Sequence, residues 1–290
     1  MKLVCYRHGS EIHYGAVKGE KVVDLSARLG GMYPDIIAFI AKDGLPIARN
    51  TVEREPGDFD YAAVELVPVV PNPGKILCVG LNYHDHVDEA NRAVGNRKVT
   101  ELPMMFPRWP ESLTAHRQPI LRPKVSDKLD WEAELLVVMG KPTGRYLPRE
   151  KALEHVFGYA CLNEACIRDY QRHSSQIGPG KNFEKTGATG PWLVTADEIP
   201  DPMNLDIEMK LNGVTMQKAN TSQMIHSIGA TIEYITRWLP LKPGDLIATG
   251  TMGGVGFART PPIFMKPGDV AEVIIERIGT LRNTIEDERL

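Results

Sequence analysis

The amino-acid sequence predicts an α+β protein in which strands predominate over helices. Short apolar runs, separated by turns rich in glycine and proline, recur along most of the chain, and this pattern is typical of many short strands. The tetrapeptide Lys-Pro-Gly-Asp occurs at residues 242–245 and again at 266–269, each time before an apolar run. Proline followed by glycine suits the two central positions of a type II turn, so both copies are expected to mark hairpin turns.

The first 70 residues are predicted to form a unit of their own. Residues 32–41 have the pattern of a short amphipathic helix. The segment Val67–Gly74 holds three prolines and a glycine, and it is expected to be a linker because proline lacks the backbone donor that helices and sheets need. We therefore predict a small β-rich module over residues 1–70 and a larger domain over residues 71–290. The apolar runs of the small module alternate with turns, at residues 2–6, 12–17 and 21–25.

In the larger domain, helical spacing of apolar residues is confined to two segments. One predicted helix begins near Arg149 and ends near Phe157. The other spans about Ser222 to Leu239, and its apolar stripe is more typical of core packing than of cofactor contact. The residues of this stripe are Met224, Ile225, Ile228, Ile232, Ile235 and Trp238.

Composition and charge exclude several classes of protein. The chain has 290 residues and a net charge of −3, and its lysines and arginines form no basic stripe interleaved with aromatic residues, so no nucleic-acid partner is expected. No apolar run approaches the ~18 residues of a membrane span, and the N-terminus lacks the apolar core of a secretion signal. The four cysteines form no Cys-x-x-Cys pair and are expected to be buried free thiols, which suits a cytoplasmic location.

Three carboxylates form a candidate metal site. Glu132 and Glu134 occur in a run from Leu129 to Gly140 that indicates a strand, and alternate residues of a strand point to the same face. Two anions beside a buried apolar run repel each other unless a cation lies between them. With Glu164 as a third ligand, the set would suit Mg²⁺, Mn²⁺ or Ca²⁺ better than Zn²⁺. The alternative is a solvated strand edge that carries acidic residues by chance.

Two histidines and a glutamate follow one another closely in Asn82–Glu89. His84 and His86 have a spacing that could suggest zinc or iron ligation, but no nearby residues complete a His/Cys ligand set. His86 and Glu89 are three residues apart and would share one face of a helical turn. A carboxylate fixes the tautomer of an imidazole and raises its basicity, which would make a water-activating pair. The alternative is an ordinary surface contact between the two side chains.

These segments and four others resemble, in the same order, the motifs of the fumarylacetoacetate hydrolase family. The resemblance covers roughly residues 73 to 284. The matching segments are Lys75–Tyr83 with His86 and Glu89, the Glu132-x-Glu134 strand, Gly158–Glu164 with Arg168-Asp169, Gly180–Phe183 before Gly190-Pro-Trp192, Leu241–Gly256, and Lys266–Asp269 through Gly279–Asn283.

The resemblance implies a mixed β-roll catalytic domain that assembles as a homodimer, with Mg²⁺, or Mn²⁺ or Ca²⁺, on Glu132, Glu134 and Glu164. Two residues depart from the family pattern. Glu164 stands where the family usually has aspartate, so its side chain is one methylene longer. Met252 stands where a proline usually follows Gly-Thr. With Glu164 the ion is expected to shift, to be bound bidentately or to be bound less tightly. With Met252 a more mobile turn and an altered substrate shape are expected.

The resemblance also implies roles for residues around the metal site. His86, oriented by Glu89, would activate water. Lys181 lies in the glycine-flanked segment Gly180–Phe183 and would contact the substrate, although an exposed loop lysine is the simpler alternative.

Two further residues are predicted to bind substrate. Thr251 lies in a glycine-rich segment that lacks the Gly-Lys-Ser/Thr ending of a phosphate loop, so it is expected to hold a small carboxylate or to form a tight turn. Arg108 would pair with a distal carboxylate of the substrate, or would serve as a loop arginine with structural contacts.

The expected activity is therefore metal-dependent hydrolysis of a carbon–carbon bond in a small β-diketo acid, such as an acylpyruvate or fumarylpyruvate, through an enolate. The alternatives on the same site are oxaloacetate decarboxylation, hydration or isomerisation of a 2-oxo-4-enoate, and cleavage of a sugar acid or ureidoglycolate. A catalytically weakened binding protein is a further alternative, because function depends on the site and not on the fold.

Overall fold

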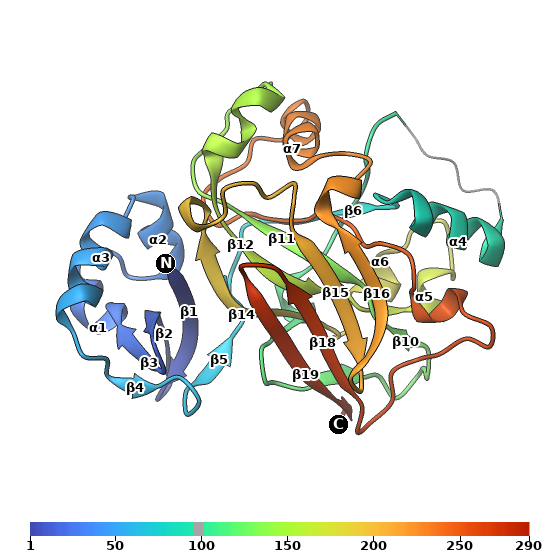
Figure 1. Ribbon diagram of the computed structural model, residues 1–290, viewed down its shortest axis with the longest axis horizontal. Coiled ribbons are helices and arrows are strands. Elements are labelled where there is room, and N and C mark those ends of the chain that lie inside the picture. Colours follow the sequence, from blue (N-terminus) through green and yellow to red (C-terminus); the bar gives the residue numbers. More distant parts are fainter. Residues whose placement is uncertain (96–100, 290) are drawn as a thin grey trace.

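The computed structural model describes residues 1–95 and 101–289 and contains one large sheet, one smaller sheet and a two-stranded ladder (Figure 1). The large sheet has the strand order β4-β3-β2-β1-β14-β12-β11-β17-β6-β7, with β5 paired to β1 and β8 paired to β14. Its strands are β1 (Lys2–His8), β2 (Glu11–Lys18), β3 (Lys21–Asp24), β4 (Phe59–Asp60), β5 (Glu65–Val67), β6 (Ile76–Gly80), β7 (Met104–Pro107), β8 (Leu113–Ala115), β11 (Ala133–Met139), β12 (Val156–Asn163), β14 (Gly187–Thr195) and β17 (Leu246–Ala248).

The smaller sheet lies against the middle of the large one, as the red and orange strands of Figure 1 show. Its order is β16-β15-β18-β19-β9, and the separate two-stranded ladder joins β10 to β13. The strands are β9 (Ile120–Arg122), β10 (Leu129–Asp130), β13 (Cys166–Ile167), β15 (Asp206–Leu211), β16 (Val214–Asn220), β18 (Val270–Ile275) and β19 (Gly279–Asp287).

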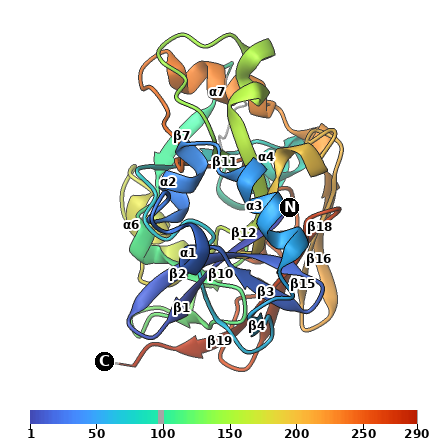
Figure 2. The same ribbon diagram turned by 90° about the vertical axis from the view of Figure 1, so that its left-hand side faces the viewer.

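The helices are short (Figures 1 and 2), and those of the first 54 residues contribute buried side chains to the core on one face of the large sheet. The α-helices are α1 (Leu25–Leu29), α2 (Ile36–Ala41), α3 (Leu45–Arg54), α4 (His84–Val94), α5 (Arg168–Gln171), α6 (Gly178–Lys181) and α7 (Ile228–Thr236). The 3₁₀ helices are η1 (Pro110–Ser112), η2 (Arg149–His155), η3 (Ala196–Glu198), η4 (Thr221–Gln223) and η5 (Gly256–Ala258). Strands thus predominate, which confirms the predicted α+β class.

Strand β11 is buried on both faces, and the alternation of its side chains decides on which face Glu134 lies. Leu135, Val137 and Met139 belong to the core between the two sheets. Leu136 and Val138 belong to a second core on the opposite face, which includes residues of the first 70. Because side chains alternate along a strand, Glu134 lies on the face of Leu136 and Val138, at the end of that apolar row.

The predicted strand from Leu129 to Gly140 is interrupted at Trp131 and Glu132, because side chains replace neighbouring strands as hydrogen-bond partners there. The backbone N–H of Glu132 donates to Asn163 Oδ1 at 3.1 Å, and that of Ala133 donates to Gln217 Oε1 at 3.0 Å. The chain can therefore leave the β10 ladder and enter β11 without unsatisfied backbone groups.

Both Lys-Pro-Gly-Asp segments form the predicted type II turn. The N–H of Asp245 donates to Lys242 O at 3.1 Å, and Gly244 has φ +82°. The second copy has the same bond between Asp269 and Lys266. Neither turn joins two strands of a hairpin, which corrects that expectation, because each is reached from an irregular segment and leads into a single strand.

The predicted helices exist but are shorter than expected. Helix α2 begins only at Ile36, where the Asp35 carboxylate accepts the N–H of Ala38. In residues 222–239 the regular α-helix is Ile228–Thr236, and Ser227 caps its start. The segment near 149–157 is the 3₁₀ helix Arg149–His155.

The first 70 residues contain three α-helices as well as strands. Strand β1 pairs antiparallel with β14, with Lys2 opposite Val194 and Leu3 opposite Leu193. The small unit therefore shares the large sheet with the rest of the chain, although its strands and helices lie at one end of the molecule (Figure 1). The division at residue 70 stays a prediction.

Two further expectations concern membranes and thiols. Within the described residues, no helix combines the length and the apolar character that a transmembrane segment requires. The four cysteines are free and buried, as predicted.

Candidate active site

The three predicted metal ligands meet in the structure. Glu132 directly precedes β11, Glu134 is its second residue, and Glu164 follows the end of β12. The β11–β12 register sets Ala133 opposite Asn163, and the N–H of Glu164 donates to Glu132 O at 2.8 Å. One carboxylate oxygen from each glutamate lies within 4.8 Å of the others, and all three side chains are buried.

Three buried cations surround this carboxylate cluster. The ammonium of Lys181, from α6, bridges Glu132, at 2.6 Å, and Glu164. Arg168 Nη1 lies 2.7 Å from Glu132 Oε1, and Arg108 Nη1 lies 2.5 Å from Glu164 Oε1. The simpler alternative of an exposed loop lysine is wrong, because Lys181 is 1% exposed.

Glu134 is the carboxylate that these cations leave uncompensated. Its Oε2 accepts the backbone N–H of Gly250 at 2.7 Å, and no lysine, arginine or histidine of the described residues forms an ion pair with it. Burial and the neighbouring Glu164 and Glu132 raise the pKa of Glu134 well above its usual value. A divalent cation would remove this penalty, so the donor set fits a hard metal ion.

Glu132 is affected in the opposite direction. Burial alone would raise its pKa, but the charges of Lys181 and Arg168 hold the pKa of Glu132 below the ordinary glutamate value. The cluster therefore contains a carboxylate held ionised next to one that is short of positive charge. This difference indicates that an added cation would be attracted chiefly toward Glu134.

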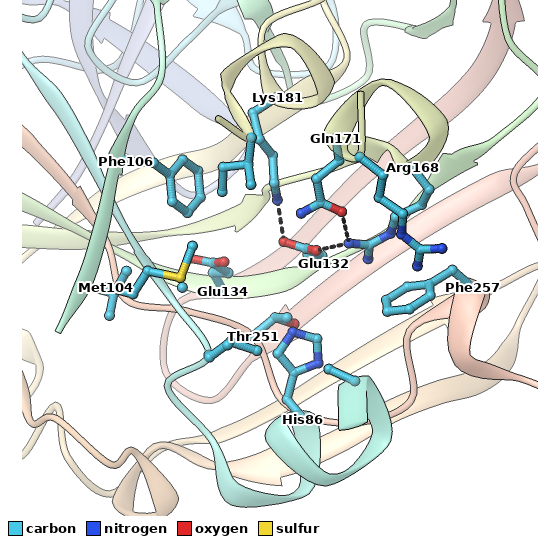
Figure 3. A pocket seen from close by; sticks show the side chains of 16 residues that line it. His86, Met104, Phe106, Glu132, Glu134, Arg168, Gln171, Lys181, Thr251 and Phe257 are labelled. Atoms are coloured by element: carbon cyan, nitrogen blue, oxygen red, sulfur yellow. Dashed lines mark hydrogen bonds and ion pairs between the residues drawn. The ribbon is translucent and has the colours of Figure 1, made fainter. Parts of the chain in front are cut away.

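The predicted His–Glu pair is formed on helix α4. His86 Nδ1 lies 2.7 Å from Glu89 Oε1, and Glu89 Oε2 accepts the N–H of Gly254 at 2.7 Å. A carboxylate partner requires that Nδ1 carry the hydrogen, which leaves Nε2 as the basic nitrogen. Both side chains are 7% exposed, which excludes the simple surface contact, whereas His84 is exposed to solvent. Figure 3 shows the imidazole of His86 across the pocket from Lys181.

The pocket between these groups is small, with a volume of about 80 Å³. His86, Glu132, Glu134, Lys181 and Thr251 all line it, so five of the predicted site residues share one cavity. Its apolar walls are formed by Val79, Leu81, Ala90, Met104, Phe106, Ile177 and Phe257.

Thr251 is held by a residue that sequence reasoning missed. Gln217 Nε2 donates to Thr251 Oγ1 at 2.9 Å and to the backbone oxygen of Met252 at 2.8 Å, while Gln217 Oε1 accepts the N–H of Ala133. The glycine-rich segment is thereby fixed to the start of β11. Met252 is fully buried, so packing holds the position where the family usually has proline.

Arg108 is placed differently from the prediction that it contacts substrate. Its guanidinium is buried behind Glu164 and is absent from the pocket lining. Besides Glu164 it donates to Ser112 Oγ at 2.8 Å and to Thr186 Oγ1 at 3.1 Å. The structure thus shows the alternative, an arginine with structural contacts that fixes the carboxylate of Glu164.

Arg168 is a pocket residue that the sequence prediction left without a role. Its Nε lies 2.7 Å from Asp130 Oδ2, and its Nη1 contacts Glu132 and also Gln171 Oε1 at 3.1 Å (Figure 3). Its remaining nitrogen, Nη2, is buried without a hydrogen-bond partner. A buried unpaired donor is costly, so this nitrogen is suited to an oxygen atom of a bound molecule.

A sequence signal for this arrangement exists in the strand pattern. Asp130 lies two residues before Glu132, so an extended chain would point Asp130, Glu132 and Glu134 to the same face, and Asp130 is fully buried. Its carboxylate accepts the N–H groups of Gly256 at 2.8 Å and Phe257 at 3.0 Å as well as Arg168. Three buried negative charges on one face need more than one cation to compensate them, so this pattern predicts a buried arginine beside them.

Fold and site together define a class of protein whose buried pocket combines a carboxylate cluster with a His–Glu pair. Residues 75–286 match the family described as fumarylacetoacetate (FAA) hydrolase C-terminal. This match covers more than half of the chain, so the protein belongs to the fumarylacetoacetate hydrolase family, as its motifs predicted.

Relatives within the family carry several activities. The chain is 34% identical over 271 residues to a mitochondrial oxaloacetate tautomerase from Xenopus laevis, covering 92% of this chain and 83% of the relative. It is 38% identical over 274 residues to a 2,4-didehydro-3-deoxy-L-rhamnonate hydrolase from a Sphingomonas species, covering 93% and 90%.

A solved structure adds a bound ion to this comparison. The maleylpyruvate hydrolase of Sphingobium sp. SYK-6, in complex with manganese(II) and pyruvate, has a TM-score of 0.81 and 29% identity, covering 100% of both chains. These comparisons support a small-molecule substrate and leave the particular reaction to be proposed.

Proposed function

We propose that the protein is a divalent-metal-dependent hydrolase that cleaves the carbon–carbon bond between C3 and C4 of a 2,4-dioxo acid. One observation carries this proposal, namely that two carboxylates of the cluster, Glu132 and Glu134, line the same small pocket as His86. A related hydrolase that binds manganese and pyruvate supports it.

The carboxylates of Glu132, Glu134 and Glu164 would hold the ion. When bound, Mg²⁺ or Mn²⁺ supplies Lewis-acid polarisation of the 2-oxo acid oxygens. Lys181 and Arg168 line the pocket and carry positive charge, so they are the proposed donors to substrate oxygens, with Lys181 exchanging one of its bonds to Glu132 and Glu164.

His86 would act as the general base, with Glu89 fixing its tautomer. Its Nε2 removes a proton from water as the water oxygen bonds to C4. The C3–C4 bond then breaks, its electron pair stays with the C3 fragment, and the imidazolium returns the proton to C3. The products are a carboxylic acid from the acyl group and pyruvate.

Oxaloacetate tautomerisation is a second candidate, because relatives with that name match most of this chain. The same histidine could move a proton between carbon and the enol oxygen without breaking a carbon–carbon bond. The mitochondrial location of some relatives belongs to those proteins, and the cytoplasmic location of this one stays a prediction. The homodimer likewise stays a prediction.

The test is turnover of purified protein with Mg²⁺ or Mn²⁺ on a set of 2,4-dioxo acids and on oxaloacetate. We expect pyruvate release from at least one 2,4-dioxo acid and a requirement for metal. His86→Ala should lower turnover by roughly 10²–10⁴-fold, whereas the exposed His84→Ala should have little effect. Interconversion of oxaloacetate tautomers, with no pyruvate from any 2,4-dioxo acid, would favour the second candidate.

A further inference from the structure

A larger apolar groove adjoins the small pocket on one side. Met104, Phe106 and Ile177 line both spaces, so the groove shares a wall with the pocket. The groove has a volume of about 710 Å³, compared with about 80 Å³ for the pocket. In Figure 3, Met104 and Phe106 lie on the opposite side of Glu132 from Arg168 and Phe257.

The groove offers no charge to a bound group. Its further walls include Met105, Trp109, Tyr170 and Phe183, and none of its described lining residues is an aspartate, glutamate, lysine, arginine or histidine. Trp109 is 54% exposed, which is unusual for so large an apolar side chain. An apolar hollow of this kind that adjoins a polar pocket is typical of a ligand-binding surface.

Two positively charged side chains lie on the side of the pocket that faces away from the groove. Arg168 and Arg172 stack on the ring of Phe257, with 4.4 Å and 4.7 Å from each guanidinium carbon to the ring centroid. A substrate group that enters the groove therefore moves away from both guanidinium groups. The ammonium of Lys181 lies 5.3 Å from the ring centroid of Phe106 but is already paired with Glu132 and Glu164. A carboxylate in the groove would therefore lose its hydration without gaining an unpaired cation, which costs free energy.

We propose that the natural substrates are 2,4-dioxo acids whose distal acyl group is uncharged and apolar, and that this group occupies the groove bounded by Met104, Phe106 and Ile177. This inference rests on the proposed hydrolase function. The reaction adds water across the C3–C4 bond, so that R–CO–CH₂–CO–COO⁻ and H₂O give R–COOH and pyruvate, with R retained as the apolar acid.

The experiment compares two substrates of equal chain length, 2,4-dioxoheptanoate and 2,4-dioxoheptanedioate, which differ in a terminal methyl or carboxylate group. We expect kcat/KM for the monoacid to exceed that for the diacid by about tenfold or more, since one misplaced group in an apolar pocket has an effect of that size. Shortening the monoacid to 2,4-dioxopentanoate should also lower kcat/KM, because the groove would be left unfilled.

A positive charge placed in the groove should weaken this preference. Met104→Lys keeps an unbranched side chain of similar length, and we expect it to raise the diacid-to-monoacid ratio of kcat/KM by about tenfold. Met32→Lys is the matched control, because Met32 is 48% exposed and lines neither the groove nor the pocket. Trp109→Lys provides a second test at the outer end of the groove should Met104→Lys fold poorly.

The outcomes separate this inference from the function on which it depends. Absence of pyruvate from all three acids would contradict the proposed hydrolase. Pyruvate release with an equal or higher kcat/KM for the diacid would overturn the apolar subsite alone. A Trp109→Lys variant that changes the oligomeric state but not the substrate ratio would assign the groove to contact between copies of the chain, and the substrate inference would be wrong.

Discussion

The ammonium of Lys181 lies where positive charge is most needed among the three glutamates. It bridges Glu132 and Glu164 but makes no ion pair with Glu134. A divalent ion that binds all three carboxylates must therefore compete with Lys181 for two of them. A singly charged side chain and a doubly charged ion cannot both lie at the centre of so small a cluster, because like charges repel.

We expect Lys181→Met to bind Mn²⁺ at least about tenfold more tightly than the native protein, because the competing cation is removed. The same variant should have a higher KM for the 2-oxo acid, since a substrate donor is lost. Isothermal titration with Mn²⁺ measures the first effect, and Lys151→Met, an exposed lysine, is the control. Equal or weaker Mn²⁺ binding in Lys181→Met would show that the ammonium does not compete with the ion.

At this scale, alternation along the chain predicted part of the site. Glu132 and Glu134 lie together because they are two residues apart in one extended segment, and a local rule is sufficient for that. Arg108 could not be placed in the same way. Its burial depends on contacts with Glu164 and Thr186, which are 56 and 78 residues away in sequence.

At the scale of the elements, the segment after β8 is hydrogen-bonded to strands β14 and β19 through His116. The N–H of His116 donates to Thr189 O at 3.1 Å, and His116 Nδ1 accepts the N–H of Arg282 at 3.0 Å. The imidazole must be neutral to accept this bond. Burial, and then the charges of Arg117 and Arg282, lower the pKa of His116 to about 4.

This lowered pKa should make stability fall with acidification. The unfolded chain binds a proton at this histidine near pH 6.5, whereas the folded protein does so only near pH 4. The free energy of unfolding should therefore decrease as the pH falls from about 6.5 to about 4. His116→Gln should lose less stability between pH 7 and pH 5 in urea titrations, while the exposed His84→Gln should follow the native protein. Identical losses in all three proteins would refute this role.

The elements also show where sequence patterns are insufficient. Turn chemistry correctly predicted both type II turns, because proline and glycine act within four residues. The break at Trp131 and Glu132 was not predicted, since it depends on Asn163 and Gln217, which supply the missing acceptors from distant strands. Helix ends were likewise shortened by local caps such as Asp35 and Ser227.

At the scale of the whole molecule, the large sheet joins the N-terminal unit to the catalytic residues. Leu3 is 1% exposed and lies opposite Leu193 of β14, whose neighbour β12 leads into Glu164. All four tryptophans lie after residue 70, and one of them, Trp192, packs against Tyr61 and Lys2 of the first 70 residues, so fluorescence reports on the larger unit and on this contact.

We expect Leu3→Ala to lower the free energy of unfolding by about 2–5 kcal/mol, as for other buried leucines. Because the sheet is shared, urea titrations followed by tryptophan fluorescence and by far-ultraviolet circular dichroism should shift together. Ile12→Ala, at a residue of β2 that is 42% exposed, should shift both signals much less. A fluorescence transition unaffected by Leu3→Ala would mean that the first 70 residues unfold independently.

The pairing of β1 with β14 has a consequence for synthesis of the chain. The partners Lys2 and Val194 are about 190 residues apart, so at ~5–20 residues per second β1 leaves the ribosome roughly 10–40 s before its neighbour exists. During that interval β1 can pair only with β2, β5 or a foreign strand. The edge of β1 that later pairs with β14 is thus the segment whose protection by chaperones would matter most while translation continues.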